Sequence, residues 1–433
     1  MNRDLTDRSA DIDARNRSEW FGAPGIFGAG LFCLVLGVFL GNKLIAAGQI
    51  IVIISLILAV FDRSNYPVVW KAMPLSGWLL VAFAAIAAAS IFVNWSNIEA
   101  PLEFLKRLRY YLIIPGMLLV PSLSRAVMEK TWRRDVLVVA LVISMLVSIL
   151  VGFITWKTGK HPFLDYLNTD FSRFAGLLGQ IINFSYTLQF VVIALAVFFW
   201  VPSLWKSVTR VPWWVVVPLL LLTGWCQYLT ACRGAMLGVV VGFTTFALMR
   251  SFKIVLVILV IGVATGSIAY LKNPRYFGSD DPIRLNQWKT GIMSFVEHPV
   301  FGLGYRNFEV HAVELKERYG IEKDSGVIEN GKWKMIYFRG HAHNNYFEAL
   351  ASTGLFGGLA FLGFCGCWTR EALRSRYAFI FVPLIAAFLV SGLFSNTFFD
   401  SETLNCIFLI YYFSQWVLHQ EKVHSLTPPL SPA

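Results

Sequence analysis

The chain has 433 residues, of which 56% are hydrophobic and only 15% are charged. This composition excludes a large soluble domain and predicts a membrane protein, because hydrophobic runs recur along nearly the whole length. The net charge of +11 fits loops that face anionic headgroups. We therefore expect membrane lipids, and no nucleic acid, among the partners.

About 22 residues at the start of the chain are polar and of mixed charge, and no cleavable signal peptide is apparent. Runs of about 20 hydrophobic residues, the length that spans a bilayer, then predict twelve helices. They are expected at 23–41, 45–61, 75–94, 109–123, 135–155, 176–201, 213–230, 233–250, 253–271, 345–367, 378–397 and 403–418. The predicted fold class is an all-α polytopic membrane protein of about twelve transmembrane helices.

The distribution of Lys and Arg predicts the orientation, because basic residues gather in short cytoplasmic loops. With the N-terminus inside, every predicted inner loop carries at least two of them. These are Arg63 and Lys71; Arg125, Lys130, Arg133 and Arg134; Lys206 and Arg210; Arg250 and Lys253; and Arg370, Arg374 and Arg376. Residues 1–22 and 419–433 are then cytoplasmic tails, which flank spans one to nine (23–271), an outer loop (272–344) and spans ten to twelve (345–418).

Two outer segments are distinctive, one of about 15 residues around 157–172 and a longer one at about 272–344. The longer segment exceeds an ordinary connection, which suggests a function. Two groups of apolar residues within it fall at helical spacing and predict two amphipathic helices on the outer membrane surface. They are Leu285, Trp288, Ile292, Phe295 and Val296, then Phe308, Ala312, Leu315 and Tyr319, the second group with Glu309, Glu314, Lys316 and Arg318 among them.

Several basic residues lie on the predicted outer side, against the orientation rule. Lys106, Arg107 and Arg109 crowd the outer start of the fourth span, and we interpret Lys106 and Arg107 as residues that reach toward headgroups or pair with an acid. A functional interpretation is stronger for three arginines from separate segments, which could converge on one site. These are Arg173, Arg233 and Arg284. The planar fork of arginine matches phosphate oxygens in bidentate geometry.

The segment His341-Ala342-His343-Asn344 lies where the outer loop meets the tenth span. Residues two apart on a helix point about 200° away from each other, so both histidines could face one site only if the segment is extended. Asn344 is a good N-cap, which places His343 at the helix entrance, facing the outer cavity. We therefore predict His343 as a catalytic residue, with His341 and Asn344 as possible support.

Metal binding by the two histidines is a weaker interpretation. Asp280 and Asp281 could add carboxylates, but no third ligand has convincing spacing. His298 and His311 are interpreted as loop and surface residues. The six cysteines lie in or beside apolar runs and are interpreted as buried apolar residues rather than disulfides. They are Cys33, Cys226, Cys232, Cys365, Cys367 and Cys406.

The spacing of His343-Asn344, nine residues, Gly354, two residues and Gly357 resembles the signature of the bacterial O-antigen ligases. These belong to a superfamily with the O-antigen polymerases and the pilin O-oligosaccharyltransferases. Two further elements are similar to those of the family, namely Thr230-Ala231-Cys232-Arg233-Gly234, and Arg284 to Trp288 followed by His298-Pro299, Gly302, Gly304 and Asn307-Phe308. Each glycine also has a structural explanation, in close helix packing or a turn.

The resemblance implies a glycosyltransferase of lipopolysaccharide biosynthesis in the bacterial inner membrane, with a periplasmic active site and both termini cytoplasmic. Its donor would be an O-antigen glycan on undecaprenyl diphosphate, and its acceptor a lipid A-core oligosaccharide. With no nucleotide-binding fingerprint and no Asp-x-Asp pair near the outer face, we expect metal-independent, inverting transfer without a cofactor. Arg233 and Arg284, helped by Arg173, would bind the diphosphate, and His343 would act as general base.

Three alternatives stay open. Some ligases continue with Thr-Thr after the second glycine, where this chain has Gly358-Leu359, so an O-antigen polymerase remains a candidate. A protein O-oligosaccharyltransferase would use the same donor. A transporter of lipid-linked glycan predicts inverted repeats and charges at mid-membrane depth, whereas no repeat is convincing here and the charges gather at one face.

Overall fold

The computed structural model describes residues 22–163, 173–177, 179–250, 281–323, 325–329, 332–337 and 339–426. Its first half contains helices α2 (Ala23–Leu40), α3 (Asn42–Phe61), α4 (Leu75–Val93), α5 (Pro101–Arg107), α6 (Arg109–Leu119), α7 (Pro121–Met128), α8 (Thr131–Thr158), α9 (Ile181–Trp200), α10 (Pro202–Val208), α11 (Val216–Leu229) and α12 (Arg233–Arg250). Short 3₁₀ turns lie at Trp70–Ala72, Trp95–Asn97 and Trp213–Val215.

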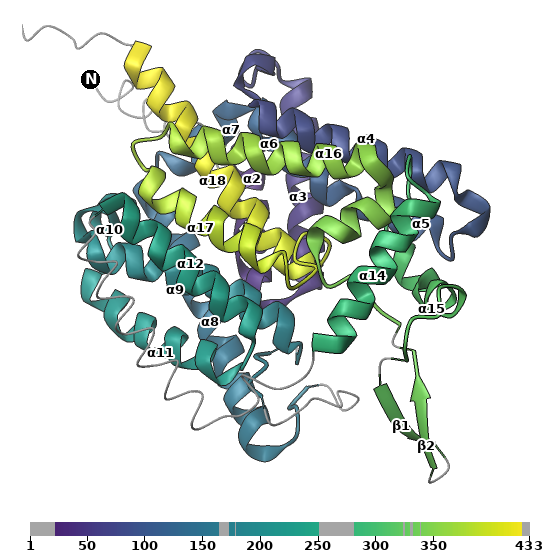
Figure 1. Cartoon of the computed structure of the whole chain (residues 1–433). Helices are drawn as coiled ribbons and strands as arrows, with labels where there is room; N and C mark the ends of the chain where they lie inside the picture. The colour runs from purple at the N-terminus through teal and green to yellow at the C-terminus, as the bar shows by residue number, and fades with distance from the viewer. Residues whose placement is uncertain are drawn as a thin grey trace, which may run out of the picture.

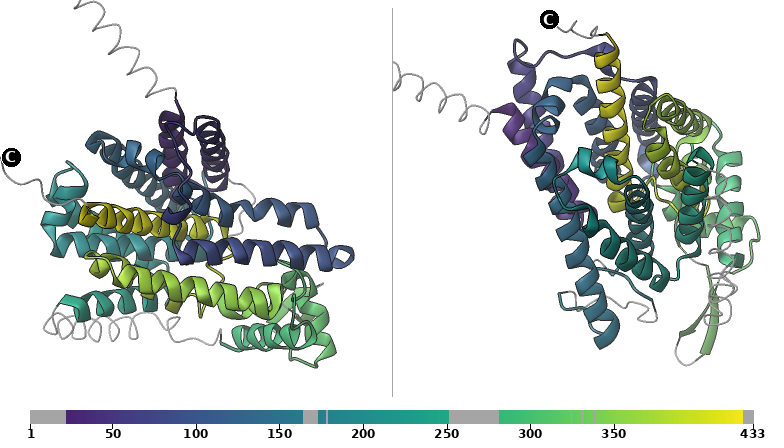
Figure 2. Two further views of the ribbon diagram at one scale, coloured as in Figure 1. Left: turned by 90° about the horizontal axis from the view of Figure 1, so that it is seen from above. Right: turned by 90° about the vertical axis from the view of Figure 1, so that its left-hand side faces the viewer.

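The second half contains α14 (Asp281–Glu297), α15 (Phe308–Arg318), α16 (Asn345–Leu373), α17 (Ala378–Ser391) and α18 (Ser401–Leu426). Strands β1 (Ser325–Glu329) and β2 (Lys332–Ile336) pair in antiparallel register, with Val327 opposite Lys334. Figure 1 shows α14 and α15 at one end of the helical bundle, and Figure 2 shows the hairpin projecting away from it. The fold is therefore helical, as expected, with one small hairpin that the sequence analysis did not predict.

Seven helices in the described part are long and apolar enough to span a membrane, and two bent pairs raise this number to nine. The chain is therefore a membrane protein. At every predicted span except 253–271, which lies outside the described residues, the structure has a helix. The number of twelve spans stays a prediction, because α17 has only 14 residues and rises about 21 Å, short of the roughly 30 Å hydrocarbon core.

The predicted span 109–123 is wrong in its boundaries. The helix ends at Leu119, and the chain bends by 81° between Pro101–Leu119 and Pro121–Met128. Pro121 explains the bend, because its ring excludes helical geometry at Val120 and it opens the next helix at its first position. A second bend of 112° separates Pro202–Val208 from Trp213–Leu229.

Helix α16 breaks at Gly354, whose φ is 68° and ψ −165°. The turn after α14 fills the break. The Leu303 amide donates to the Ala351 carbonyl at 2.9 Å, and the Leu355 amide donates to the Pro299 carbonyl at 2.8 Å. These bonds satisfy backbone groups that the break leaves without helical partners. The turn and the helix are thus interlocked, and we call this contact the α14–α16 staple.

A nonhelical loop, residues 392–400, crosses the interior between α17 and α18. Phe398 is fully buried and packs against Phe83, Tyr111, Phe361 and other rings. The Phe398 amide donates to Asn345 Oδ1 at 2.9 Å, and the Tyr111 hydroxyl donates to the Phe398 carbonyl at 3.0 Å. The predicted span 378–397 therefore extends too far, because the hydropathy of a buried loop resembles that of a span.

Helices occupy both predicted amphipathic segments, but they present different faces. On α15, Phe308, Ala312 and Leu315 are buried, whereas on α14 the apolar Leu285, Ile292 and Val296 are exposed. The buried side of α14 is polar instead. Its fully or nearly fully buried residues include Asn286, Gln287, Thr290 and Ser294. An outward apolar face suits a helix that lies against lipid, and Lys289 of α14 is exposed as well.

Candidate functional site

The three predicted arginines and His343 line one cavity of about 50 Å³. Its remaining wall is formed by Ile182, Tyr186, Ala231, Cys232, Phe394 and Ser395. No carboxylate lines it among the described residues. Segments far apart in sequence therefore meet at a small, strongly cationic cavity, which is electrostatically suited to an anionic group.

Arg173 lies before α9 and is fixed to the turn that precedes α12. Its Nε donates to the Thr230 carbonyl at 2.8 Å, and its Nη2 donates to the Ala231 carbonyl at 3.2 Å. Ala231 adopts a left-handed backbone with φ of 47°, which is unfavourable for a residue with a Cβ. The guanidinium thus uses part of its donor fork to hold the turn and faces the cavity with the rest.

Arg233 is the first residue of α12, so it combines its own charge with the positive end of the helix dipole. The next residue, Gly234, is required for space, because a Cβ there would lie 2.1 Å from the Tyr186 hydroxyl. That hydroxyl is buried at the wall of the cavity, where Cys232 and Ser395 lie beside it.

Arg284 comes from the first turn of α14, far in sequence from the other two arginines, and also lines the cavity. The packing of α14 on the start of α16 fixes its position. Trp288 lies with its ring centroid 6.0 Å from that of Phe347, and Gly291 allows the Phe347 Cβ to approach closely. Arg284 thus contributes positive charge to a cavity that no carboxylate lines among the described residues.

The residues on either side of His343 in the sequence hold it in position. Asn344 caps α16, and its Oδ1 accepts from the amides of Tyr346 at 2.9 Å and Phe347 at 3.1 Å. The Asn344 amide group also donates to the Leu393 carbonyl at 3.1 Å. On the other side, Ala342 is fully buried. His343 itself has a φ of 49°, and such a left-handed conformation persists only when its surroundings enforce it.

The environment of His343 favours the neutral imidazole. Burial, together with smaller contributions from the nearby positive groups His341, Arg284 and Lys316, lowers the pKa of His343 from 6.5 to about 4. A neutral imidazole has a free nitrogen lone pair that can accept a proton. The same positive groups would attract an anion, whose charge would in turn raise this pKa.

His341 does not line the cavity. Its Nδ1 lies 3.4 Å from Glu309 Oε2, and its side chain points to α15 instead. Lys106 pairs with Glu103 at 2.7 Å on the surface, as expected. Arg109 binds Gln49 at 2.7 Å. As expected, His343 lines the cavity and His341 does not. Asp280, named above as a weak candidate metal ligand, lies outside the described residues.

Sequence reasoning missed several residues that support the cavity. The buried Glu348 carboxylate accepts from the Ala342 amide at 2.9 Å and from the Ser352 hydroxyl at 3.0 Å, which anchors the loop before His343. Lys316, expected on an outer face, is fully buried. The signal for Glu348 was its position one turn after the N-cap in an apolar helix, where an acid is costly unless it is bonded.

Arg306 is a further residue that the sequence analysis did not identify. It has a left-handed φ of 63°, and its Nη1 donates to the Phe399 carbonyl of the buried loop. Asp400 is the last residue of this loop, and burial raises the pKa of its carboxyl despite the neighbouring Arg306 and His341.

The described residues contain no group of three or more His, Cys, Asp or Glu side chains arranged to hold a metal ion. None of the six cysteines forms a disulfide. Four of them are buried, as predicted, whereas Cys33 and Cys367 are only half-buried.

Residues 218–362 match the family model described as O-antigen ligase. This region belongs to the O-antigen ligase family. The match includes Arg233, Arg284 and His343, whereas Arg173 lies before it. No curated protein is similar enough to the chain to count as a match. The family match and the candidate membrane-spanning helices together indicate a membrane protein that contains a region of the O-antigen ligase type.

Proposed function

We propose that the protein transfers an O-antigen glycan from undecaprenyl diphosphate to a lipid A-core oligosaccharide, at the periplasmic face of the bacterial inner membrane. The observation that carries this proposal is the convergence of three arginines and a neutral histidine on one cavity. The arginines suit the diphosphate, and the histidine suits the acceptor hydroxyl. Both groups are needed to break a bond to a phosphate while a new glycosidic bond forms.

In the proposed reaction, an acceptor hydroxyl oxygen attacks the anomeric carbon of the donor sugar. The bond from that carbon to the phosphate oxygen breaks, and the electron pair leaves with undecaprenyl diphosphate. The hydroxyl proton passes to the neutral imidazole of His343. A single displacement of this kind inverts the anomeric centre.

The arginines would act mainly on the leaving group. Negative charge on the diphosphate grows as the anomeric bond breaks, and fixed donors that face this charge stabilise the transition state. Arg233 and Arg284 offer such donors from two different helices that line the cavity, and Arg173 helps through its remaining N–H groups. A cavity with this density of positive charge would repel a divalent cation, which is why we propose metal-independent transfer.

Reconstitution of the pure protein in liposomes with an undecaprenyl diphosphate-linked glycan tests the proposal. Extension of lipid A-core oligosaccharide is expected, unchanged by a chelator. Extension of a second lipid-linked glycan instead would identify a polymerase, and extension of neither would refute both functions. A requirement for an added divalent metal would refute the metal-independent mechanism.

The variant His343→Ala should reduce transfer to background while the protein remains folded and inserted. His311→Ala is a matched control, because His311 lies on the same outer segment but does not line the cavity. Its Nδ1 instead lies 3.3 Å from Glu314 Oε2. Near-normal transfer by His343→Ala would exclude His343 as the general base.

A further inference from the structure

An open groove of about 640 Å³ lies between α16 and α17, apart from the cationic cavity. Leu362, Cys365, Gly366 and Leu373 of α16 line it, and Leu389 of α17 lies opposite. It is apolar over most of its length. Because Leu362 and Leu373 are about half exposed and α16 is a candidate membrane span, the groove opens on a surface that faces lipid.

The two ends of the groove differ in chemistry. Tyr346 lies at one end, where its hydroxyl donates to the Leu389 carbonyl at 2.9 Å. Arg370 and Arg374 lie at the other end, one helical turn apart and therefore on the same face of α16. Glu371, the acid between them, is turned to the opposite face, where it accepts from the Ser76 amide at 3.1 Å.

Within the part of the chain that the structure describes, no acid neutralises the arginine pair. Among the described residues, neither Arg370 nor Arg374 forms an ion pair within 4 Å, and no carboxylate lines the groove. Two adjacent positive charges at the end of an apolar channel complement a molecule with one anionic head and an apolar chain. A purely apolar occupant would leave this charge pair without a role.

The length of the groove supports the same conclusion. The twelve residues from Leu362 to Arg374 rise about 18 Å along a helix, which is close to the roughly 15 Å of hydrocarbon in one leaflet. An acyl chain in one leaflet can therefore extend along the groove while its headgroup lies beside the arginines. Gly366 leaves the middle of the channel open, because a Cβ at this position would meet no atom within 4 Å.

We propose that this groove is a binding site for an anionic phospholipid, with an acyl chain along α16 and the headgroup phosphate between Arg370 and Arg374. Anionic phospholipids are abundant on the cytoplasmic side of membranes, the side to which the basic loops assign these arginines. The site lies at the opposite end of α16 from His343, so it does not depend on the proposed glycosyl transfer. It would anchor the end of the helix whose other end carries the histidine.

Native mass spectrometry of the full-length protein in detergent, with an equimolar mixture of phosphatidylglycerol and phosphatidylcholine, tests this site. Wild-type protein should retain phosphatidylglycerol in preference. The variant Arg370→Gln/Arg374→Gln should lose at least about tenfold in this retention, since each basic residue near an anionic headgroup contributes about a fivefold factor. Arg63→Gln/Lys71→Gln is the control, because it removes two charges from another predicted inner loop.

A second pair of variants tests the channel itself. Gly366→Leu should fill the groove and lower retention of phosphatidylglycerol. Gly224→Leu is its control, since Gly224 of α11 is also open to space for a side chain. Unchanged retention in the double arginine variant, equal retention of both lipids, or a change of oligomeric state in Gly366→Leu would each overturn the proposal, the last by indicating a second copy of the chain as the occupant.

Discussion

At the scale of single residues, left-handed backbone conformations occur in and near the cavity. Among non-glycine residues in the described part of the chain, Ala231, Arg306 and His343 have φ of 47°, 63° and 49°. Such conformations cost on the order of 1–3 kcal/mol each. Two of the three line the cavity itself, so the fold accepts local strain at the place where it needs defined side-chain directions.

The lowered pKa of His343 predicts an unusual pH profile. Because the pKa of the free protein is about 4, the imidazole stays neutral well below the ordinary value near ~6.5. The value of kcat/KM, which reports the free enzyme, should therefore hold from pH 7 down to about 5. The measurement is transfer in liposomes at limiting donor across this range.

Binding of the lipid-linked donor should move the acid limb of the pH profile to higher pH. A bound diphosphate offsets the positive charges of Arg284 and Lys316, which raises the pKa of His343. The acid limb of kcat, which reports the donor complex, should lie at higher pH than the acid limb of kcat/KM. Coincident limbs, or a kcat/KM that already falls at pH 6.5, would contradict the assignment of His343 as a buried base.

The substitution Arg233→Lys retains charge but removes the planar fork. A charge-assisted hydrogen bond contributes about 1.5–3 kcal/mol, so we expect a loss of roughly 10- to 100-fold in kcat/KM. Arg339→Lys is the matched control, since Arg339 is an exposed outer arginine that pairs with Glu99 at 3.0 Å. Equal activities of the two variants would assign Arg233 a structural role.

At the level of elements, the glycines of the family signature have structural roles. A Cβ on Gly354 would lie 2.2 Å from the Val300 carbonyl, and one on Gly302 would lie 2.6 Å from the Ala351 carbonyl. Both glycines also have positive φ. They permit the α14–α16 staple, which fixes the distance between the helix that carries Arg284 and the loop that carries His343.

Gly354→Ala should therefore destabilise the protein by more than about 1 kcal/mol, from the left-handed backbone alone. The backbone contact at Val300 adds to this cost. Gly224→Ala should be neutral or stabilise by up to about 1 kcal/mol, because it improves helix propensity without a clash. Thermal unfolding in detergent compares them. A melting temperature of Gly354→Ala equal to that of wild type would show that the staple is not required.

The sequence predicted the convergence of the three arginines and His343 on one cavity better than the bounds of the helices that carry them. Arg233, Arg284 and His343 stood out because charge on the predicted outer side is rare, and rare residues carry information. Loop 392–400 did not stand out, because a window of apolar residues such as Phe398 and Phe399 has the same hydropathy whether it is a helix or a buried loop. The apolar residues of α14 have the spacing that a soluble helix uses to face its core. This spacing alone does not show whether the apolar side faces the protein or the lipid.

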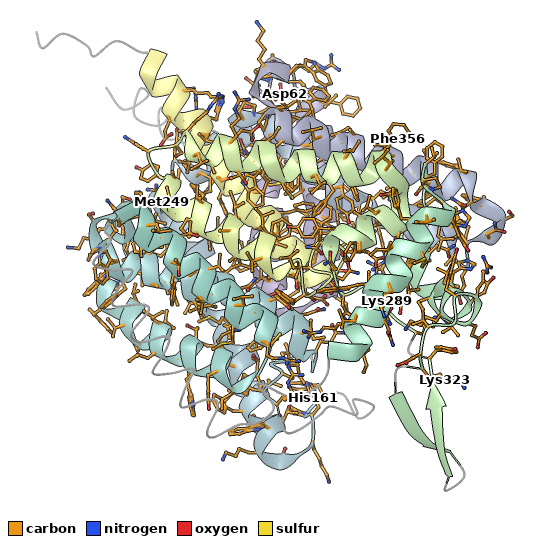
Figure 3. The ribbon with its side chains drawn as sticks, in the orientation of Figure 1. Asp62, His161, Met249, Lys289, Lys323 and Phe356 are labelled. Atoms are coloured by element: carbon orange, nitrogen blue, oxygen red, sulfur yellow. The ribbon has the colours of Figure 1, made fainter. Side chains whose placement is uncertain are left out.

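On the scale of the whole molecule, residues from the two predicted sides lie at different ends of the structure. Figure 3 shows Asp62 and Met249, next to the basic residues of two predicted inner loops, at the top and left. It shows His161 and Lys323, from the two predicted outer segments, at the bottom and lower right. A bundle that spans one membrane requires this separation of its inner and outer loops.

This sidedness can be measured with cysteine variants. Lys323→Cys should react with a membrane-impermeant maleimide in intact spheroplasts, whereas Asp62→Cys should react only after the membrane is permeabilised. The wild-type protein is the control, since its native cysteines are buried or half-buried. Labelling of Asp62→Cys from outside would invert the orientation and place the cavity on the cytoplasmic side.

The cavity has two walls, and the α14–α16 staple belongs to only one of them. Arg284 and His343 belong to one wall, because the staple joins α14 to α16. Arg173 and Arg233 belong to the other, because hydrogen bonds tie Arg173 to the turn that starts α12, and α12 packs on α9 and α17. The Asn344 side chain also bonds to the loop after α17, and α12 packs on α17. The two walls are therefore connected through α17, and a shift of this helix would move the residues of both pairs.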